Sequence, residues 1–364
     1  MAAQLISYIA LGAPATRGPA TGDEPFLRPE IGFTPNWYRQ SLVIDFGERW
    51  HTDPAYRRDC LIAMGREVRR RFGNVKIGGV RNPDEPDDLL TGTFGSCVVA
   101  SIYGVPTLYA ADNWPCSEHQ YLTAEEVDLL DPPDLDRNPF FQGVMEQVEW
   151  IAGERGRVEG YLNWQGVLNN AYRLRGEELF VDMALEPARA NHIFECVRTT
   201  MAEGALRLYA RQRETGVEVR HFTMSNCLVN MVSPEQYREL LLPHDRWLAG
   251  QFELVGIHNC AWCADPYLDY YAEVPNVGYI DMGIDSNLRR AKRMFSEARR
   301  AIMYTPMDLA GKTLEGLRSD LGRIARQYGP CDVIFADIEA GVPDERVLSA
   351  VSLCASLSDH RWHD

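Results

Sequence analysis

Residues 254–265 read LVGIHNCAWCAD, a short apolar run that ends in an imidazole and two thiols. The apolar run predicts a buried β-strand, and side chains two positions apart on a strand project from the same face. His258 and Cys260 are therefore expected side by side where the strand ends. A lone buried histidine or cysteine is usually a packed core residue, but an imidazole and a thiolate paired at a strand end suit zinc. We interpret the pair as part of a metal site.

Strand and helix patterns alternate on both sides of this stretch. Further strands are predicted near 31–37, between 75 and 108, and at 158–163, 217–225, 277–282, 301–305 and 332–337. Such steady alternation is typical of parallel β/α units. About eight strands favour a (β/α)8 TIM barrel over a doubly wound sheet, and the sequence has no glycine-rich phosphate loop. We predict a single barrel domain over residues 31–364, with an N-terminal extension (an arm rich in Gly, Pro and Ala) over residues 1–30.

Three helix starts can be read from their capping residues. Asp53 stands before a proline and a helix pattern that runs to about residue 72, which predicts an N-cap with proline at the first helical position. Thr123 opens a capping box, and Ser233 precedes another proline at the start of a helix pattern.

The composition limits the classes of partner and compartment. With 364 residues, 45% of them hydrophobic, the chain has ample material for a globular core. A formal charge of −15 disfavours binding to nucleic acid or to an anionic membrane, because both require a basic surface. No apolar run is long enough for a membrane span, and the first residues do not resemble a signal peptide. The nine scattered cysteines fit free thiols in a reducing compartment, so we predict a cytoplasmic protein.

Polar residues follow several of the predicted strands. In a barrel of this kind the active site lies at the carboxyl ends of the strands. Asn226 and Cys227 follow the fourth strand, Asp281 the sixth, and Asp337 and Glu339 the eighth, where strand periodicity aims both carboxylates inward. We predict catalytic roles for Asn226 and Asp337 and substrate contacts for Cys227 and Asp281. Packing explains Cys227 equally well.

Several segments resemble the uroporphyrinogen decarboxylase superfamily. They are GVL at 166–168, LRGEEL at 174–179 ahead of Pro187, VSPEQYRELLLP at 232–243, and HNC at 258–260. The resemblance extends over roughly residues 30–355 and implies the barrel fold and a homodimer. The porphyrinogen decarboxylases of the family use no metal and carry an N-terminal arginine-rich substrate motif.

The N-terminal motif is reduced in this sequence. Trp37, Tyr38 and Arg39 are at most a remnant of it, and we assign these three residues to substrate binding. Trp50 and Trp114 are further candidates to line a pocket for an aromatic or quaternary donor, although packing inside the barrel explains these aromatic residues equally well.

The H-x-C element is instead similar to the zinc-dependent methyltransferase branch, which works with corrinoid proteins. In that branch the third zinc ligand is a cysteine just after the last strand, and the corresponding position here holds Glu339. Cys263 competes for this role, because it extends the motif to H-x-C-x-x-C, but it falls where the chain turns into the next helix. We predict His258, Cys260 and Glu339 as the zinc ligands. A carboxylate donates less charge than a thiolate, which favours activation of a methyl donor such as a methyl ether.

The resemblance also implies an activity. Zinc would deprotonate a bound thiol or polarise a bound oxygen near neutral pH. A methyl group would then move between a small methylated substrate and the cobalt of a corrinoid (cobalamin) carried by a partner protein, as in O-demethylation. Two other hypotheses compete: a metal-free decarboxylase of a porphyrinogen-like or other carboxylated substrate, and a non-catalytic protein that binds a corrinoid or tetrapyrrole.

Overall fold

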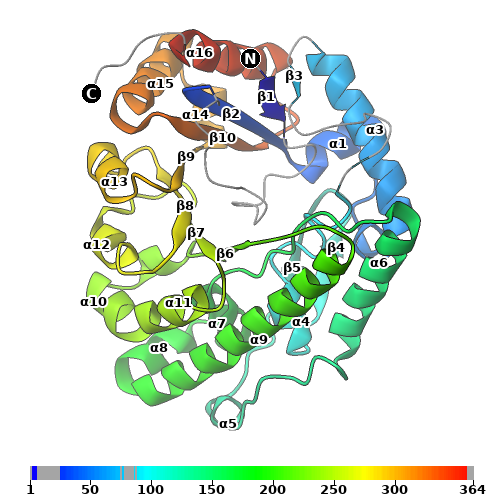
Figure 1. Ribbon diagram of the computed structural model, residues 1–364, viewed down its shortest axis with the longest axis vertical. Coiled ribbons are helices and arrows are strands. Elements are labelled where there is room, and N and C mark those ends of the chain that lie inside the picture. Colours follow the sequence, from blue (N-terminus) through cyan, green and yellow to red (C-terminus); the bar gives the residue numbers. More distant parts are fainter. Residues whose placement is uncertain (1, 6–24, 74–75, 78–85, 87, 359–364) are drawn as a thin grey trace.

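A curved parallel sheet of eight strands forms the centre of the computed structural model, which describes residues 2–5, 25–73, 76–77, 86 and 88–358 (Figure 1). The strands are β1 (Ala2–Leu5), β2 (Leu27–Phe33), β3 (Lys76–Ile77), β6 (His221–Ser225), β7 (Leu254–His258), β8 (Val277–Gly283), β9 (Arg299–Tyr304) and β10 (Cys331–Ile338). They pair in the order β3-β1-β2-β10-β9-β8-β7-β6, and every pair is parallel. A separate antiparallel hairpin consists of β4 (Thr107–Ala110) and β5 (Asn113–Ser117).

Helices form an outer layer around the strands (Figure 1). The longer ones are α1 (Pro35–Leu42), α3 (Pro54–Phe72), α6 (Pro139–Arg155), α7 (Val167–Arg175), α8 (Glu178–Leu185), α9 (Pro187–Glu214), α11 (Leu242–Ala249), α13 (Leu288–Met294), α15 (Leu314–Tyr328) and α16 (Asp344–Ser358). Shorter helices are α2 (Glu48–Thr52), α4 (Val98–Ile102), α5 (Ala124–Asp128), α10 (Pro234–Gln236), α12 (Leu268–Tyr271) and α14 (Pro306–Gly311). None of the helices in the described part of the chain is both long and apolar enough to cross a membrane.

The capping predictions are confirmed. The Asp53 side chain accepts from two backbone N–H groups in the first turn of α3, and a proline follows it. Thr123 and Ser233 both form complete capping boxes, at α5 and α10. Local hydrogen bonds of this kind depend only on neighbours in the sequence, which is why they can be predicted without the fold.

The strand predicted at 158–163 is irregular chain in the structure. Gly160 adopts a φ of 108°, outside the range of a strand. The Gln212 side chain donates to the carbonyls of Val158 and Gly160, at 3.2 and 2.9 Å. Thr215 Oγ1 accepts from the Val158 N–H at 3.0 Å. Side chains of α9 and its C-terminal cap thus form hydrogen bonds with the backbone groups that would otherwise pair with a neighbouring strand. Within the described residues, β6 and β3 are the two edges of the sheet and do not pair with each other.

The N-terminal boundary also differs from the prediction. β2 begins at Leu27, so the proposed division between residues 30 and 31 falls inside a strand. Residues 2–5 of the predicted arm form β1, which lies between β2 and β3 in the sheet; residues 6–24 lie outside the described part. The strand expected near 31–37 ends at Phe33, because Thr34 caps α1 and a proline follows it.

Candidate metal centre

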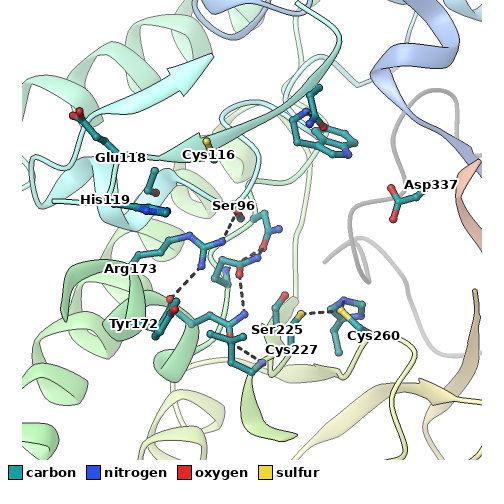
Figure 2. A pocket seen from close by; sticks show the side chains of 18 of the residues that line it. Ser96, Cys116, Glu118, His119, Tyr172, Arg173, Ser225, Cys227, Cys260 and Asp337 are labelled. Carbon is teal, nitrogen blue, oxygen red and sulfur yellow. Dashed lines mark hydrogen bonds between the residues drawn. The ribbon is translucent and has the colours of Figure 1, made fainter. Parts of the chain in front are cut away.

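Three potential metal ligands meet at the carboxyl ends of β6 and β7. Cys227 follows β6, His258 is the last residue of β7, and Cys260 lies two positions further on. The sulfur of Cys260 is 3.0 Å from the sulfur of Cys227 and 3.1 Å from Nε2 of His258. One ligand atom from each residue lies within 4.8 Å of the others. Figure 2 shows the two cysteines facing each other in the pocket. We call these three residues the donor cluster.

The backbone around the donor cluster is held by the pairing of β6 with β7 and by a hydrogen bond from Gly283 to the loop after β7. Ser225 is paired with His258 across β6 and β7, and the next N–H, of Asn226, donates to the His258 carbonyl at 2.7 Å. Cys260 has a φ of 55°, a left-handed conformation that a cysteine rarely adopts. Gly283, at the end of β8, donates its N–H to the Trp262 carbonyl at 2.9 Å and so holds the loop that follows Cys260.

Asp281 fixes the orientation of the His258 ring. Its Oδ2 lies 2.6 Å from Nδ1 of His258 and accepts a second hydrogen bond from the Tyr279 hydroxyl at 3.0 Å. Its Oδ1 accepts the Asn259 N–H at 2.8 Å. With Nδ1 turned to the carboxylate, Nε2 faces Cys260. A carboxylate behind an imidazole is the usual outer partner of a metal-binding histidine, because it sets the tautomer and raises the basicity of the ligand.

The charges of the donor cluster are strongly coupled. Burial lowers the pKa of His258, but the negative charge of Asp281 and the two neighbouring sulfurs hold it well above the ordinary value. A hydrogen bond from Cys260 and the imidazolium of His258 lower the pKa of Cys227, against the effect of burial. The same hydrogen bond, together with burial, raises the pKa of Cys260. Without a metal, the geometry therefore favours a Cys227 thiolate that accepts a hydrogen bond from the Cys260 thiol.

The donor cluster opens into a pocket of about 610 Å³. This volume lies within the range of small-molecule sites. One side of the pocket is formed by Thr34, Trp114, Asp337 and Glu339. Another side is formed by α7 and the chain before it, through Asn163, Gln165, Asn169, Tyr172 and Arg173. Figure 2 shows Arg173 and Asp337 well apart from each other, with the two cysteines in view between them.

A bulge directs Asp337 toward the pocket. β10 carries one residue more than β2 between Phe335 and Ile338, and Asp337 within that step has a φ of 53°. Both Asp337 and Glu339 line the pocket, in agreement with the predicted inward direction of the two carboxylates. Asp337 is exposed to the pocket. Partial withdrawal of its carboxyl group from water and the charge of Glu339 raise its pKa to about 6, and a hydrogen bond with the Trp114 side chain opposes the shift.

Comparisons with known proteins show a relationship at the level of structure. No protein-family model matches the sequence, and no curated protein matches it. The chain shares its fold with a methyltransferase from Methanosarcina mazei. The likeness covers 92% of this chain and 94% of the other, with a TM-score of 0.61 and 13% sequence identity. At this identity the methyltransferase-like fold is shown, and the chemistry has to be argued from the site.

The structure brings a residue other than the predicted Glu339 next to His258 and Cys260. Glu339 lies outside the donor cluster, and its Oε2 accepts from the Thr34 hydroxyl at 3.3 Å. Cys263 is exposed and also lies outside the cluster. Cys227, predicted to contact substrate or to pack, is the third member of the donor cluster. The sequence could not show this, because the approach of Cys227 to Cys260 depends on the register of two strands.

Two of the predicted site residues act behind the donor cluster. Asn226 is 3% exposed and donates from its amide to Asp245 at 3.0 Å; Asp281 is completely buried. Neither residue lines the pocket. Asn226 is thus a structural residue and Asp281 an orienting one, in place of the catalytic and substrate-binding roles predicted for them.

The N-terminal aromatic residues belong to the core. Trp37 and Tyr38 lie on α1 with 1% and 0% exposure, and the Trp37 ring stacks on Phe33 at 4.1 Å. Arg39 follows them on α1 and does not line the pocket, and Trp50 is completely buried. Their predicted role in substrate binding is therefore wrong for this pocket. Of the aromatic candidates, Trp114 alone lines it.

Sequence reasoning missed the side of the pocket that α7 provides. Asn169, Tyr172 and Arg173 project from this helix, and Asn163 and Gln165 lie on the chain that leads into it. The one available clue was the run NWQGVLNN at 163–170, in which four side-chain amides lie close together at the start of a helix. Buried amides of this density are uncommon in a core and indicate a polar cavity.

Proposed function

We propose that this protein is a zinc-dependent methyltransferase that moves a methyl group between a small substrate and the cobalt of a corrinoid, the corrinoid being carried by a partner protein. The observation that carries the proposal is the donor cluster of Cys227, His258 and Cys260 at the base of a substrate-sized pocket. The methyltransferase-like fold and the resemblance of the H-x-C element support it.

The donor cluster fits zinc. Two thiolates and one imidazole, with a fourth position left for water or substrate, are a known catalytic zinc set. The carboxylate of Asp281 behind His258 completes the arrangement. A zinc ion held there supplies Lewis acidity, which favours the ionised form of a bound thiol or polarises a bound oxygen.

The other residues of the pocket have separate tasks in this proposal. Asp281 keeps Nε2 of His258 directed at the site. Asp337 faces the pocket with a pKa of about 6, so its carboxyl group can accept or release a proton close to neutral pH. The aromatic rings of Trp114 and Tyr172 provide apolar contact area for the body of a small substrate.

The direction of transfer is left open by this donor set. The preference for a methyl ether donor depended on a carboxylate ligand, and the proposed ligand set has a second thiolate instead. A decarboxylase of a polycarboxylated tetrapyrrole fits less well, because Arg173 is the one arginine or lysine that lines the pocket within the described residues.

The first test is metal content after purification without chelators or metal-affinity resin. We expect about one zinc ion per chain, lost in Cys227→Ala and in Cys260→Ala with unchanged circular dichroism. Cys263→Ser and Glu339→Gln are the matched controls and should retain the metal. Zinc retained in both alanine variants would contradict the site.

The second test is methyl transfer. The zinc-loaded protein is screened with methyl ethers, methylated amines and methyl thioethers in the presence of cob(I)alamin, and with thiols in the presence of methylcobalamin, by following the visible spectrum. Turnover that requires Cys227 and Cys260 supports the proposal. Loss of carbon dioxide from a carboxylated tetrapyrrole, with no methyl transfer in either direction, would replace it with the decarboxylase. Corrinoid binding without either reaction would indicate a non-catalytic binding protein.

A further inference from the structure

A second pocket, of about 550 Å³, lies between α13 and α15 beside the start of β9. Figure 1 shows these two helices next to each other in the outer layer. Because β9 begins here, the pocket is at the amino ends of the parallel strands, opposite to the donor cluster. Five of the seven described residues that line it are basic and none is acidic, in a chain with 37 basic and 52 acidic residues. The seven are Arg289, Lys292, Arg293, Ser296, Arg300, Arg326 and Gln327. We call it the basic pocket.

Three of the basic residues come from one face of α13. Arg289, Lys292 and Arg293 occupy positions i, i+3 and i+4 of this helix, a spacing at which like charges repel. Arg289 and Arg293 are exposed and form no ion pair within the described residues. Arg290, between them, does not line the pocket and is paired with Asp269 at 2.5 Å. The helix therefore pairs the arginine outside the basic pocket and leaves two arginines inside it without a carboxylate.

Arg300 distinguishes the basic pocket from an ordinary solvated surface. The helix dipole favours basic residues in the last turns of α13 and α15, but Arg300 is the second residue of a strand and is 6% exposed. Its terminal nitrogens donate to the carbonyls of Phe295, Ser296 and Pro330 at 3.0–3.1 Å. Its Nε is buried and has no hydrogen-bond partner in the described part of the chain. A guanidinium withdrawn from water, with neutral acceptors alone, is destabilising until an anion joins it.

The acidic side chains nearby in the sequence have other partners. Asp332 bonds to Arg299 at 2.6 Å, and Arg299 projects from β9 on the face opposite to Arg300, because consecutive strand residues alternate. Glu297 accepts from the Ser296 hydroxyl at 3.1 Å and lines a separate, smaller pocket. Neither carboxylate lines the basic pocket. Among the described residues, Arg300 thus has no carboxylate partner.

We propose that the basic pocket binds a small polyanion with two or more linked phosphate groups. A terminal phosphate offers three acceptor oxygens, so one group can contact more than one guanidinium, and the planar fork of arginine suits it. Each such group carries about 1.5 to 2 negative charges near neutral pH. Two groups therefore offset the charges of Arg289, Arg293 and Arg300, the three that have no carboxylate partner.

The size and the charge of the protein favour a small ligand over nucleic acid. A volume of about 550 Å³ is within the range of small-molecule sites. The formal charge of −15 repels a long polyanion, which would also have to approach the acidic remainder of the surface. The inference does not depend on the proposed function, because the basic pocket shares no described residue with the pocket at the donor cluster.

The test is calorimetry on the zinc-loaded protein at about 0.1 M salt. The probes are orthophosphate, pyrophosphate, triphosphate, citrate and a short single-stranded oligonucleotide. Additional charge-assisted hydrogen bonds predict that pyrophosphate and triphosphate bind about 10- to 100-fold more tightly than orthophosphate. Citrate should bind more weakly than triphosphate, because a carboxylate offers two oxygens in one plane.

Variants assign the binding to the basic pocket. Replacing the two exposed arginines together, in Arg289→Gln/Arg293→Gln, should weaken triphosphate about 10- to 100-fold. The matched control is Arg213→Gln/Arg318→Gln, which removes the same charge at exposed positions outside the pocket and should keep the affinity. Arg300→Gln should also weaken binding; if this buried change prevents folding, the exposed pair decides.

Two further variants exclude the other site. Cys260→Ala removes a ligand of the proposed zinc ion, which could itself hold a polyphosphate, and Arg173→Gln removes the arginine of the pocket at the donor cluster. Both should bind triphosphate as the unmodified protein does, whether or not the protein transfers methyl groups.

The inference is overturned by any of four results. They are no binding of triphosphate, no preference for it over orthophosphate or citrate, unchanged affinity in Arg289→Gln/Arg293→Gln, or loss of affinity in Cys260→Ala or Arg173→Gln. Tighter binding of the oligonucleotide than of triphosphate would replace the small ligand with a nucleic acid.

Discussion

Asp281 lies behind the candidate metal site and orients His258 without offering a ligand atom of its own to the donor cluster. Its carboxylate bonds to His258, to the Tyr279 hydroxyl and to the Asn259 N–H, so a single buried side chain fixes both the ring of the histidine and the chain beside it. The interaction with Nδ1 is the one that matters for a ligand, because it determines which nitrogen is free.

We predict that Asp281→Asn weakens zinc binding by about 10- to 100-fold and leaves the fold intact. The amide can still bond to Tyr279, but it provides no negative charge behind the ring. Competition with a chromophoric chelator gives the affinity. Asp285→Asn, a change at an exposed carboxylate shortly after the same strand, should have no effect. Equal affinities in the three proteins would show that Asp281 does not act on the ligand.

Asp337 makes stability depend on pH. Partial withdrawal from water and the charge of Glu339 raise its pKa from the usual 3.8 to about 6, so the folded state binds the proton more tightly than the unfolded state does. Stability therefore falls as the pH rises from about 4 to about 6, and above that range the ionised carboxylate opposes folding. The full shift corresponds to about 3 kcal/mol, and solvent in the pocket reduces the expected effect to about 1 kcal/mol.

The corresponding variant is Asp337→Asn. It should be more stable than the unmodified protein by about 1 kcal/mol near pH 7.5, and the gain should vanish near pH 4, where the carboxyl is protonated in both states. Urea unfolding at several pH values measures it, with Asp59→Asn at an exposed position as the control. A gain that is independent of pH would mean that the titration of Asp337 is not its cause.

At the same scale, His258 and Cys260 could be located from the sequence because they follow one apolar run. Their proximity does not arise from the strand period, since β7 ends at His258 and Cys260 has a φ of 55°. Asp337 and Glu339 were correctly placed at the pocket, although the bulge that turns Asp337 was not visible in the sequence. Cys227 as a ligand and Arg173 as a pocket residue were missed, because each depends on a neighbouring element that is distant in the chain.

The end of β8 supports the loop that carries Cys260. Gly283 approaches this loop so closely that an added Cβ would lie 2.0 Å from the carbonyl oxygen of Ala261. The clash is with backbone, so no side chain can rotate away from it. Two elements, β8 and the loop after β7, are therefore held in contact by the absence of a side chain.

We predict that Gly283→Ala displaces the loop, lowers the free energy of unfolding by about 1–3 kcal/mol, and weakens zinc binding because Cys260 moves with it. Gly143→Ala on α6 is the matched control: its Cβ meets no atom within 4 Å, so it should leave both quantities unchanged or raise stability slightly. Chemical denaturation and zinc titration of both variants check this. Normal zinc affinity in Gly283→Ala would show that the loop position is set elsewhere.

Helices and strands could be predicted where the signal involves only residues close together in the sequence. β7 and the capped starts of α3, α5 and α10 are as predicted, because strand period and N-caps involve neighbours in the sequence. The failure at 158–163 has the opposite origin. An apolar run is compatible with a strand, but the Gln212 side chain on α9, distant in the sequence, donates hydrogen bonds to the carbonyls of Val158 and Gly160 instead.

For the whole molecule, alternation of strands and helices was enough to predict a parallel α/β fold with its site at the carboxyl ends of the strands. The order of the strands, and the opening between β6 and β3 among the described residues, could not be derived in the same way. One of the eight strands, β1, comes from the segment predicted as an arm, where the sequence has few of the branched apolar residues that mark a strand.

The donor cluster also has a consequence for the kinetics of metal exchange. His258 and Cys260 are neighbours in any conformation of the chain, whereas Cys227 is separated from Cys260 by 33 positions and joins them through the pairing of β6 with β7. An unfolded chain therefore offers two neighbouring ligands, and Cys227 joins them only after β6 has paired with β7. An ion bound to all three would leave when this strand pair opens locally, well before global denaturation. Its residence time would then report the opening rate of one strand pair.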